Sequence, residues 1–125
     1  MPERTVPVRV NDETFEREVI RSPLPVVVDF YADWSAPCRA TEPVFRDLSE
    51  RLAGRVKFAT VNVDEASLVT RSYGIHSIPT FVFLRGGHET GREVGPVDPV
   101  GFRTILRRHF PAPRRPPSGG KPASR

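Results

Sequence analysis

Cysteine is nearly absent from the sequence, since Cys38 is the only one in 125 residues. A single thiol excludes an intramolecular disulfide, so the fold cannot depend on a disulfide framework. Long apolar runs are also missing: stretches such as Val26-Val27-Val28 are far shorter than the ~20 residues that cross a bilayer. The chain opens with the charged segment Met1-Pro2-Glu3-Arg4, which predicts no signal peptide, no membrane attachment and a cytoplasmic location.

Acidic residues are missing from the C-terminal end of the chain. Residues 111–125 hold four basic side chains and no acid, and they account for the whole net charge of +4. The other 15 basic residues and all 15 acidic residues lie in residues 1–110, which are therefore neutral. We interpret residues 1–110 as one domain and residues 111–125, rich in proline and glycine, as a disordered basic tail. Nucleic-acid binding through that tail is not favoured.

Strand and helix patterns alternate along the domain. Residues 26–31 form a β-branched run with a single acid, typical of a central strand covered on both faces. Further strands are expected over residues 6–10, 56–63, 80–84 and 89–94, and helices over residues 11–20, 38–53, 65–73 and 98–110. Asn11 or Asp12 can cap the first of these helices, and Asp98 can cap the last. The turn Arg85-Gly86-Gly87-His88 indicates a hairpin between the last two strands. The order predicts an α/β fold, in which helices flank a mixed sheet with a parallel start and an antiparallel C-terminal hairpin.

Four separated segments together resemble those of one protein family, and they occur in the same order. Residues 28–38 end in Trp34-Ser35-Ala36-Pro37-Cys38, where thioredoxins have Trp-Cys-Gly-Pro-Cys. The other three are Val61-Asn62-Val63-Asp64, Tyr73-Gly74-Ile75-His76-Ser77-Ile78-Pro79-Thr80, and Gly86-Gly87 with Val94-Gly95. The resemblance to the thioredoxin family covers roughly residues 5–110. It implies a thioredoxin fold and a cis peptide bond before Pro79.

The resemblance also implies an active-site position, and there the chain departs from the family. A thioredoxin uses two thiols: the first attacks a substrate disulfide, and the second resolves the mixed disulfide and releases reduced product. Here Ser35 stands at the first position and Cys38 at the second. A hydroxyl is far less acidic than a thiol, and a helix dipole of about half a charge cannot close that gap. Two-thiol turnover is therefore excluded by composition unless a partner supplies the second thiol.

Ser35 has a structural role open to it in place of catalysis. At a helix start its side chain can accept a hydrogen bond from the amide near Cys38, with Pro37 in the first turn. A serine nucleophile needs a base, and His76, the only histidine that the resemblance places near the site, lacks an orienting third group. We therefore interpret His76 as a loop residue in contact with water. Neither a metal nor a cofactor is expected.

Cys38 and Asp29 complete the chemistry that the resemblance implies. In the family the position of Cys38 holds the more buried thiol, which favours a packing role. A mixed disulfide between Cys38 and glutathione or a partner is the alternative. Asp29 matches an acid buried beneath the site, where burial raises the pKa and the carboxylate can accept a proton. The family commonly sets a lysine beside this acid, but the matching residue is Thr60, which predicts a still higher pKa for Asp29.

A groove for extended peptides is the other part of the site that the resemblance implies. Its flat apolar patch is formed by Trp34, Ala36, Pro37, Ser77, Ile78, Pro79, Val94 and Gly95. The backbone of Ile78 would pair with a bound peptide as an added strand, and none of these contacts needs a cysteine at position 35. The leading hypothesis is a monomeric thioredoxin-like protein that binds an extended segment of a partner protein, with little or no dithiol–disulfide turnover.

The alternative hypothesis is a thiol–disulfide oxidoreductase, a protein-disulfide reductase in which Ser35 has replaced the first cysteine naturally or by engineering. The rest of the site remains in place, as a single recent change would leave it. Thr60, and Pro96 after the groove glycine, depart from the family as well. One substitution does not explain those departures, which favours divergence.

Overall fold

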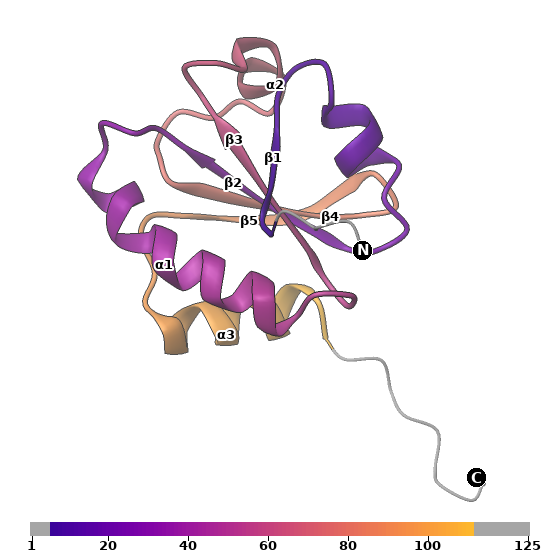
Figure 1. Cartoon of the computed structure of the whole chain (residues 1–125), viewed down its shortest axis with the longest axis vertical. Coiled ribbons are helices and arrows are strands. Elements are labelled where there is room, and N and C mark those ends of the chain that lie inside the picture. The colour runs from indigo at the N-terminus through magenta and orange to yellow at the C-terminus, as the bar shows by residue number, and fades with distance from the viewer. Residues whose placement is uncertain (1–5, 112–125) are drawn as a thin grey trace, which may run out of the picture.

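The computed structural model describes residues 6–111 and arranges them around one central sheet (Figure 1). In chain order the elements are β1 (Val8–Val10), the π-helix η1 (Glu16–Ile20), β2 (Val26–Tyr31), α1 (Ala36–Arg51), β3 (Lys57–Asn62), α2 (Ser67–Ser72), β4 (Thr80–Arg85), β5 (His88–Val94) and α3 (Pro99–His109). This alternation confirms the predicted α/β class. Of the tail expected over residues 111–125, everything after Pro111 lies outside the described residues, as do residues 1–5.

The sheet is mixed, as the sequence predicts. Its strand order is β1-β3-β2-β4-β5. β3 runs parallel to both β1 and β2, whereas the β2–β4 and β4–β5 pairs are antiparallel. Gly86 and Gly87 have φ angles of 60° and 82°, the positive values that the two-residue turn of the β4–β5 hairpin requires. β2 therefore lies at the centre, with Asp29 between Thr60 of β3 and Phe81 of β4.

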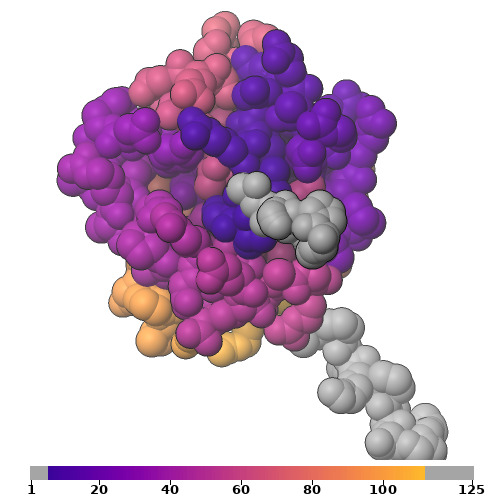
Figure 2. Space-filling view, in the orientation of Figure 1, coloured from indigo at the N-terminus to yellow at the C-terminus, as the bar shows by residue number. Residues whose placement is uncertain are grey.

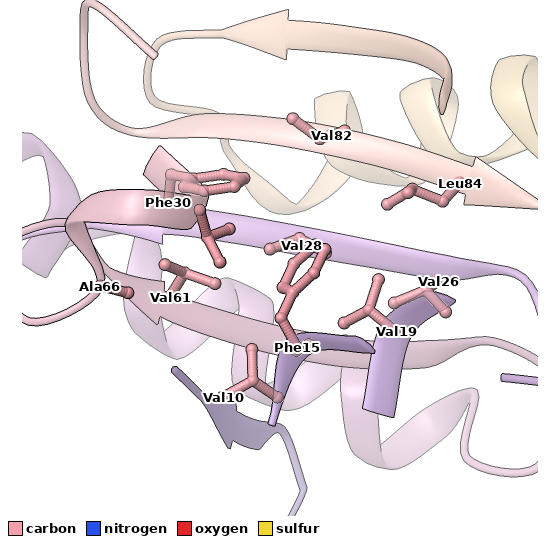
Figure 3. Close-up of a cluster of buried hydrophobic side chains, with 12 residues drawn as sticks. Val10, Phe15, Val19, Val26, Val28, Phe30, Val61, Ala66, Val82 and Leu84 are labelled. Atoms are coloured by element: carbon pink, nitrogen blue, oxygen red, sulfur yellow. The ribbon is translucent and has the colours of Figure 1, made fainter. Parts of the chain in front are cut away.

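Successive residues of β2 enter two cores, one on each face of the sheet. Val26 and Val28 belong to the core that η1 and α2 cover, which Figure 3 shows in close-up. Val27 belongs to the second core, beneath α1 and α3, where the rings of Phe45 and Phe102 stack with centroids 5.9 Å apart. Both faces of the central strand are covered, as its apolar run predicts.

The first two elements are shorter than the sequence pattern predicts. β1 begins at Val8 rather than residue 6, and the regular helix before β2 is the short η1. Asn11 caps this helical segment as predicted: its Oδ1 accepts hydrogen bonds from the amides of Glu13 and Thr14 at 2.9 and 3.0 Å, and its carbonyl accepts one from the Phe15 amide at 3.0 Å. Residues 12–14 form a turn that leads from the cap into η1.

Two later helices also differ at their ends. α1 begins at Ala36 rather than Cys38, because the preceding residue, Ser35, is its N-cap. The helix expected over residues 65–73 is reduced to α2, since the amides of Glu65 and Ala66 both donate to the carbonyl of Asn62 in a turn. The cap of α3 was predicted correctly: Asp98 Oδ1 accepts a hydrogen bond from the Gly101 amide at 2.7 Å.

Two helical elements cover each face of the sheet, and the loop that enters α1 carries the residues of the candidate site. α1 and α3 lie together on one face, while η1 and α2 cover the other (Figure 1). In the space-filling view, α1 and α3 form one adjoining surface at the lower edge, and α2 lies at the upper edge (Figure 2). The loop from the carboxyl end of β2 to the amino end of α1 carries Trp34 and Ser35.

Candidate functional site

Ser35 and Cys38 lie at the amino terminus of α1. The Ser35 backbone is extended (φ −90°, ψ 118°), and its Oγ accepts a hydrogen bond from the Cys38 amide at 3.3 Å. Pro37 occupies the first turn, where a missing amide proton leaves no hydrogen bond unmade. Ser35 and Cys38 are only 5% and 4% exposed. The hydroxyl is therefore a buried helix cap, as predicted, and the thiol is buried in the first turn of the helix.

His76 takes no part in a Ser–His arrangement. Its side chain is exposed, which confirms its interpretation as a loop residue in contact with water. Among the hydrogen bonds of residues 6–111, none joins it to Ser35, whose Oγ is engaged with the Cys38 amide. Within the same part of the chain, no group of three His, Cys, Asp or Glu side chains could hold a metal ion. No helix there is both long and apolar enough to cross a membrane.

Asp29 is a buried carboxylic acid on the face of the sheet that α1 covers. It is 4% exposed, and its Oδ1 has no hydrogen-bond partner among the described residues. Burial, and to a lesser degree the Glu42 carboxylate of α1, raises the pKa of Asp29 to about 8. The group is therefore mostly protonated at pH 7, and it gains the capacity to accept a proton only as the pH rises toward 8. The predicted buried acid and the direction of its pKa shift are both confirmed.

No ammonium group offsets this burial. Asp29 lies directly beside Thr60 in the β2–β3 register. Lys57, the only lysine in the described part of the chain, instead donates to the carboxylate and the backbone carbonyl of Glu18, both at 2.8 Å. That pairing lowers the pKa of Glu18. The one lysine that could neutralise a buried acid is thus held against η1, away from Asp29.

The residues proposed for the groove come from the α1 loop, the segment before β4 and the end of β5. The Ile78–Pro79 peptide bond is cis. The Gly95 amide donates to the carbonyl of Pro79 at 2.8 Å, which ties the end of β5 to this segment. Of the eight groove residues, Trp34, Ala36, Pro37, Ser77 and Val94 are exposed, Ile78 and Gly95 are partly buried, and Pro79 is buried.

Two features of this surface suit an extended ligand. Trp34 and Val94, 68% and 62% exposed, are two of the four large hydrophobic side chains exposed in the described residues. Within residues 6–111, neither backbone polar group of Ile78 has a hydrogen-bond partner, whereas its neighbours Ser77 and Pro79 both accept one through their carbonyls. An added strand would supply partners for the Ile78 groups.

Two contacts of the site were not expected from the sequence. The Trp34 indole donates to Asp64 Oδ2 at 2.9 Å, and the Thr80 hydroxyl donates to the Ser77 carbonyl at 2.6 Å. Asp64 lies in one of the segments that carry the family resemblance, so that segment could have drawn attention to it. Glu42 also raises the pKa of Asp29. No motif in the sequence points to Glu42, because only the packing of α1 over β2 brings the two carboxylates together.

Comparison with known proteins agrees with this architecture. A family model described as Thioredoxin matches residues 6–107. Thioredoxin 1 of Nostoc sp. is 40% identical over 102 residues, which cover 82% of this chain and 95% of that protein. The thioredoxin of Allochromatium vinosum is 44% identical over 90 residues (72% and 84%). Thioredoxin 1 of Synechococcus elongatus is 38% identical over 106 residues (85% and 99%).

Proposed function

Because the chain belongs to the thioredoxin family, we propose that it keeps the family's capacity to bind an extended protein segment and has lost two-thiol disulfide reduction. The bound segment lies across Trp34, Val94 and the Ile78–Pro79 peptide bond. Ser35 acts as a helix cap, and Cys38 serves at most as a secondary thiol. The observation that carries the proposal is an exposed apolar surface beside a capped serine: Trp34 and Val94 are 68% and 62% exposed, while the Ser35 hydroxyl accepts from the Cys38 amide.

The electron balance supports the loss of turnover. Reduction of a protein disulfide by a thioredoxin transfers two electrons and leaves two enzyme thiols joined as a disulfide. This chain has one thiol. If Cys38 attacked a substrate disulfide, one substrate thiol would leave and a Cys38–substrate mixed disulfide would remain. Only an external thiol could then release the product, and the burial of Cys38 opposes even the first attack.

The exposed surface supports retained binding. Trp34 is held by Asp64 with its ring largely in solvent, so ordering this ring adds little entropy cost when a ligand binds. Ile78 offers both of its backbone groups to a partner strand. None of these contacts involves the residue at position 35.

A protein-disulfide reductase that has lost only its first cysteine is the second candidate. Asp29 is buried with a raised pKa, the peptide bond before Pro79 is cis, and Cys38 occupies the first turn of α1. Those features supply the rest of a thioredoxin site. The residue beside Asp29 separates the two candidates. It is Thr60 rather than the lysine common in the family, so the substitution Ser35→Cys restores the first thiol but leaves Asp29 without a cationic neighbour.

Peptide selection tests the binding proposal. A phage-displayed library of linear decapeptides is selected on the immobilised chain, and the selected peptides are measured against Trp34→Ala and Ile78→Asp. Both substitutions are expected to weaken binding at least tenfold. Arg55→Ala is the matched control: Arg55 is exposed and follows the far end of α1, a helix about 24 Å long at 1.5 Å per residue. Binding that survives both groove substitutions contradicts the proposal.

A further inference from the structure

A hollow of about 360 Å³ lies between the end of β3, α2 and the segment that precedes the cis peptide bond. Its lining includes Val63, Thr70, Arg71, Ile75 and His76. Two of these side chains are cationic or become so on protonation, and the lining contains no aspartate or glutamate. The hollow therefore offers positive charge together with apolar walls.

Sequence neighbours place this hollow beside the groove. Val63 precedes Asp64, whose carboxylate accepts the Trp34 indole hydrogen bond. On the other side, His76 precedes Ile78 by two residues. Two residues of extended chain span at most about 7 Å, so Ile78 and His76 lie close together. A peptide residue that is one to three positions from the residue paired with Ile78 can therefore reach the hollow.

The basic side chains of the hollow are not paired with acids of the described residues. Among residues 6–111, no ion pair involves Arg71 or His76. The two acids of the adjoining β3–α2 turn are already engaged: Asp64 accepts from Trp34, and Glu65 pairs with Arg9 at 3.4 Å. A carboxylate that entered the hollow would meet an exposed guanidinium that no acid of residues 6–111 pairs with, and the two groups would form a charge-assisted hydrogen bond.

We propose that this hollow is a specificity pocket that takes an acidic side chain, aspartate or glutamate, of the extended segment bound in the groove. Arg71 makes the principal contact and His76 the second. The inference rests on the proposed binding function and deepens it, because it names the chemistry of the segment that the chain selects. The Trp34 side of the groove provides apolar contact, and the pocket provides preference for charge.

The probes are acetylated and amidated octapeptides of alanine and valine. A single glutamate is placed at each position in turn, and each peptide has a twin with glutamine at that position. Binding is measured by isothermal titration calorimetry, because this method needs no tryptophan signal and the Trp34→Ala variant can be measured in the same way. Each titration is made at low and at physiological salt. Glutamate at one position or two nearby positions is expected to bind three- to fivefold tighter than its glutamine twin at low salt, roughly the range of a solvent-accessible ion pair.

Substitutions in the chain assign that preference. Arg71→Gln is expected to abolish the advantage of glutamate and His76→Gln to reduce it, while Arg55→Gln, at an exposed arginine beyond the far end of α1, leaves it unchanged. Equal affinity for the twins, with both weakened by Trp34→Ala, overturns the pocket and leaves the groove standing. A preference that survives Arg71→Gln, or one equal at every position, also overturns it. Binding of no peptide in either series overturns the groove proposal together with the pocket.

Discussion

The Ser35 hydroxyl accepts a hydrogen bond from the amide of Cys38, three residues further along the chain. This contact gives the residue at the family's attacking position a structural task, because it satisfies one of the free amides at the start of α1. The neighbouring thiol is left without a partner cysteine anywhere in the sequence. The chemistry of the site therefore depends on what one buried thiol and one buried acid can do.

Removal of the cap tests the role of Ser35. Ser35→Ala is expected to lower the free energy of unfolding by about 1 kcal/mol, within the range of roughly 0.5–2 kcal/mol for lost N-caps. Asp98→Ala, at the cap of α3, is expected to give a similar loss, and Ser67→Ala, which removes no cap hydrogen bond, a change within about 0.5 kcal/mol. Urea denaturation measures all three. If Ser35→Ala behaves like Ser67→Ala, the hydroxyl does not stabilise the helix.

Asp29 makes stability depend on pH. Its pKa is about 8 in the folded protein and near 3.8 when unfolded. Between these values the native state binds more protons than the unfolded state, so the free energy of unfolding falls as the pH rises from about 4 to about 8. Asp29→Asn mimics the protonated acid and is expected to remove most of this slope, with a gain above about 2 kcal/mol at pH 9 and little change at pH 4.

Denaturation at pH 4, 7 and 9 measures this effect. Asp33→Asn is the control, because Asp33 is an exposed acid four residues away and is expected to leave the slope intact. A slope that persists unchanged in the Asp29→Asn protein would show that other groups set the pH dependence.

Cys38 is expected to be protected in the native state. With 4% of its surface exposed, its thiol reacts with a maleimide only when the first turn of α1 opens. Its labelling rate is expected to be roughly 100-fold slower in buffer than in denaturant. Mass spectrometry over time gives both rates. A native rate within a factor of about ten of the denatured rate would identify an accessible thiol and revive the mixed-disulfide alternative.

Asp64 is expected to orient Trp34 for binding without contributing much to stability. The bond between them is exposed, so Asp64→Ala is expected to change the free energy of unfolding by less than about 1 kcal/mol. The freed indole rotates more widely, which lowers its fluorescence anisotropy and weakens groove-binding peptides two- to threefold. Unchanged anisotropy in the variant contradicts the orienting role.

Local sequence signals predicted most of the fold. The apolar run of β2, the glycine pair of the hairpin and the Asp98 cap each act over a few residues, and all three were predicted correctly. Asn11 also acts locally as predicted, because its Oδ1 accepts hydrogen bonds from the amides of Glu13 and Thr14 at the start of the first helical segment. The local signals did not predict that this segment becomes the π-helix η1, since an apolar spacing of 3.6 residues indicates an α-helix.

The site was predictable to the extent that it follows from position in the chain. Ser35 and Cys38 are three residues apart, so the cap could be foreseen. Glu42 beside Asp29, and Lys57 turned toward Glu18, depend on how α1 and η1 pack on the sheet. No spacing in the sequence encodes those contacts, although the main cause of the raised Asp29 pKa, burial in the central strand, follows from the predicted fold.

Reduction of a protein disulfide, with excess dithiol as the electron source, tests the central claim most directly. The chain is compared with its Ser35→Cys variant, and with Ser35→Cys combined with Cys38→Ser as the single-thiol control. We predict no turnover above the dithiol background for the unaltered chain or for the control, whatever the rate of the Ser35→Cys variant. Turnover by the unaltered chain would contradict the claim that it has lost two-thiol chemistry.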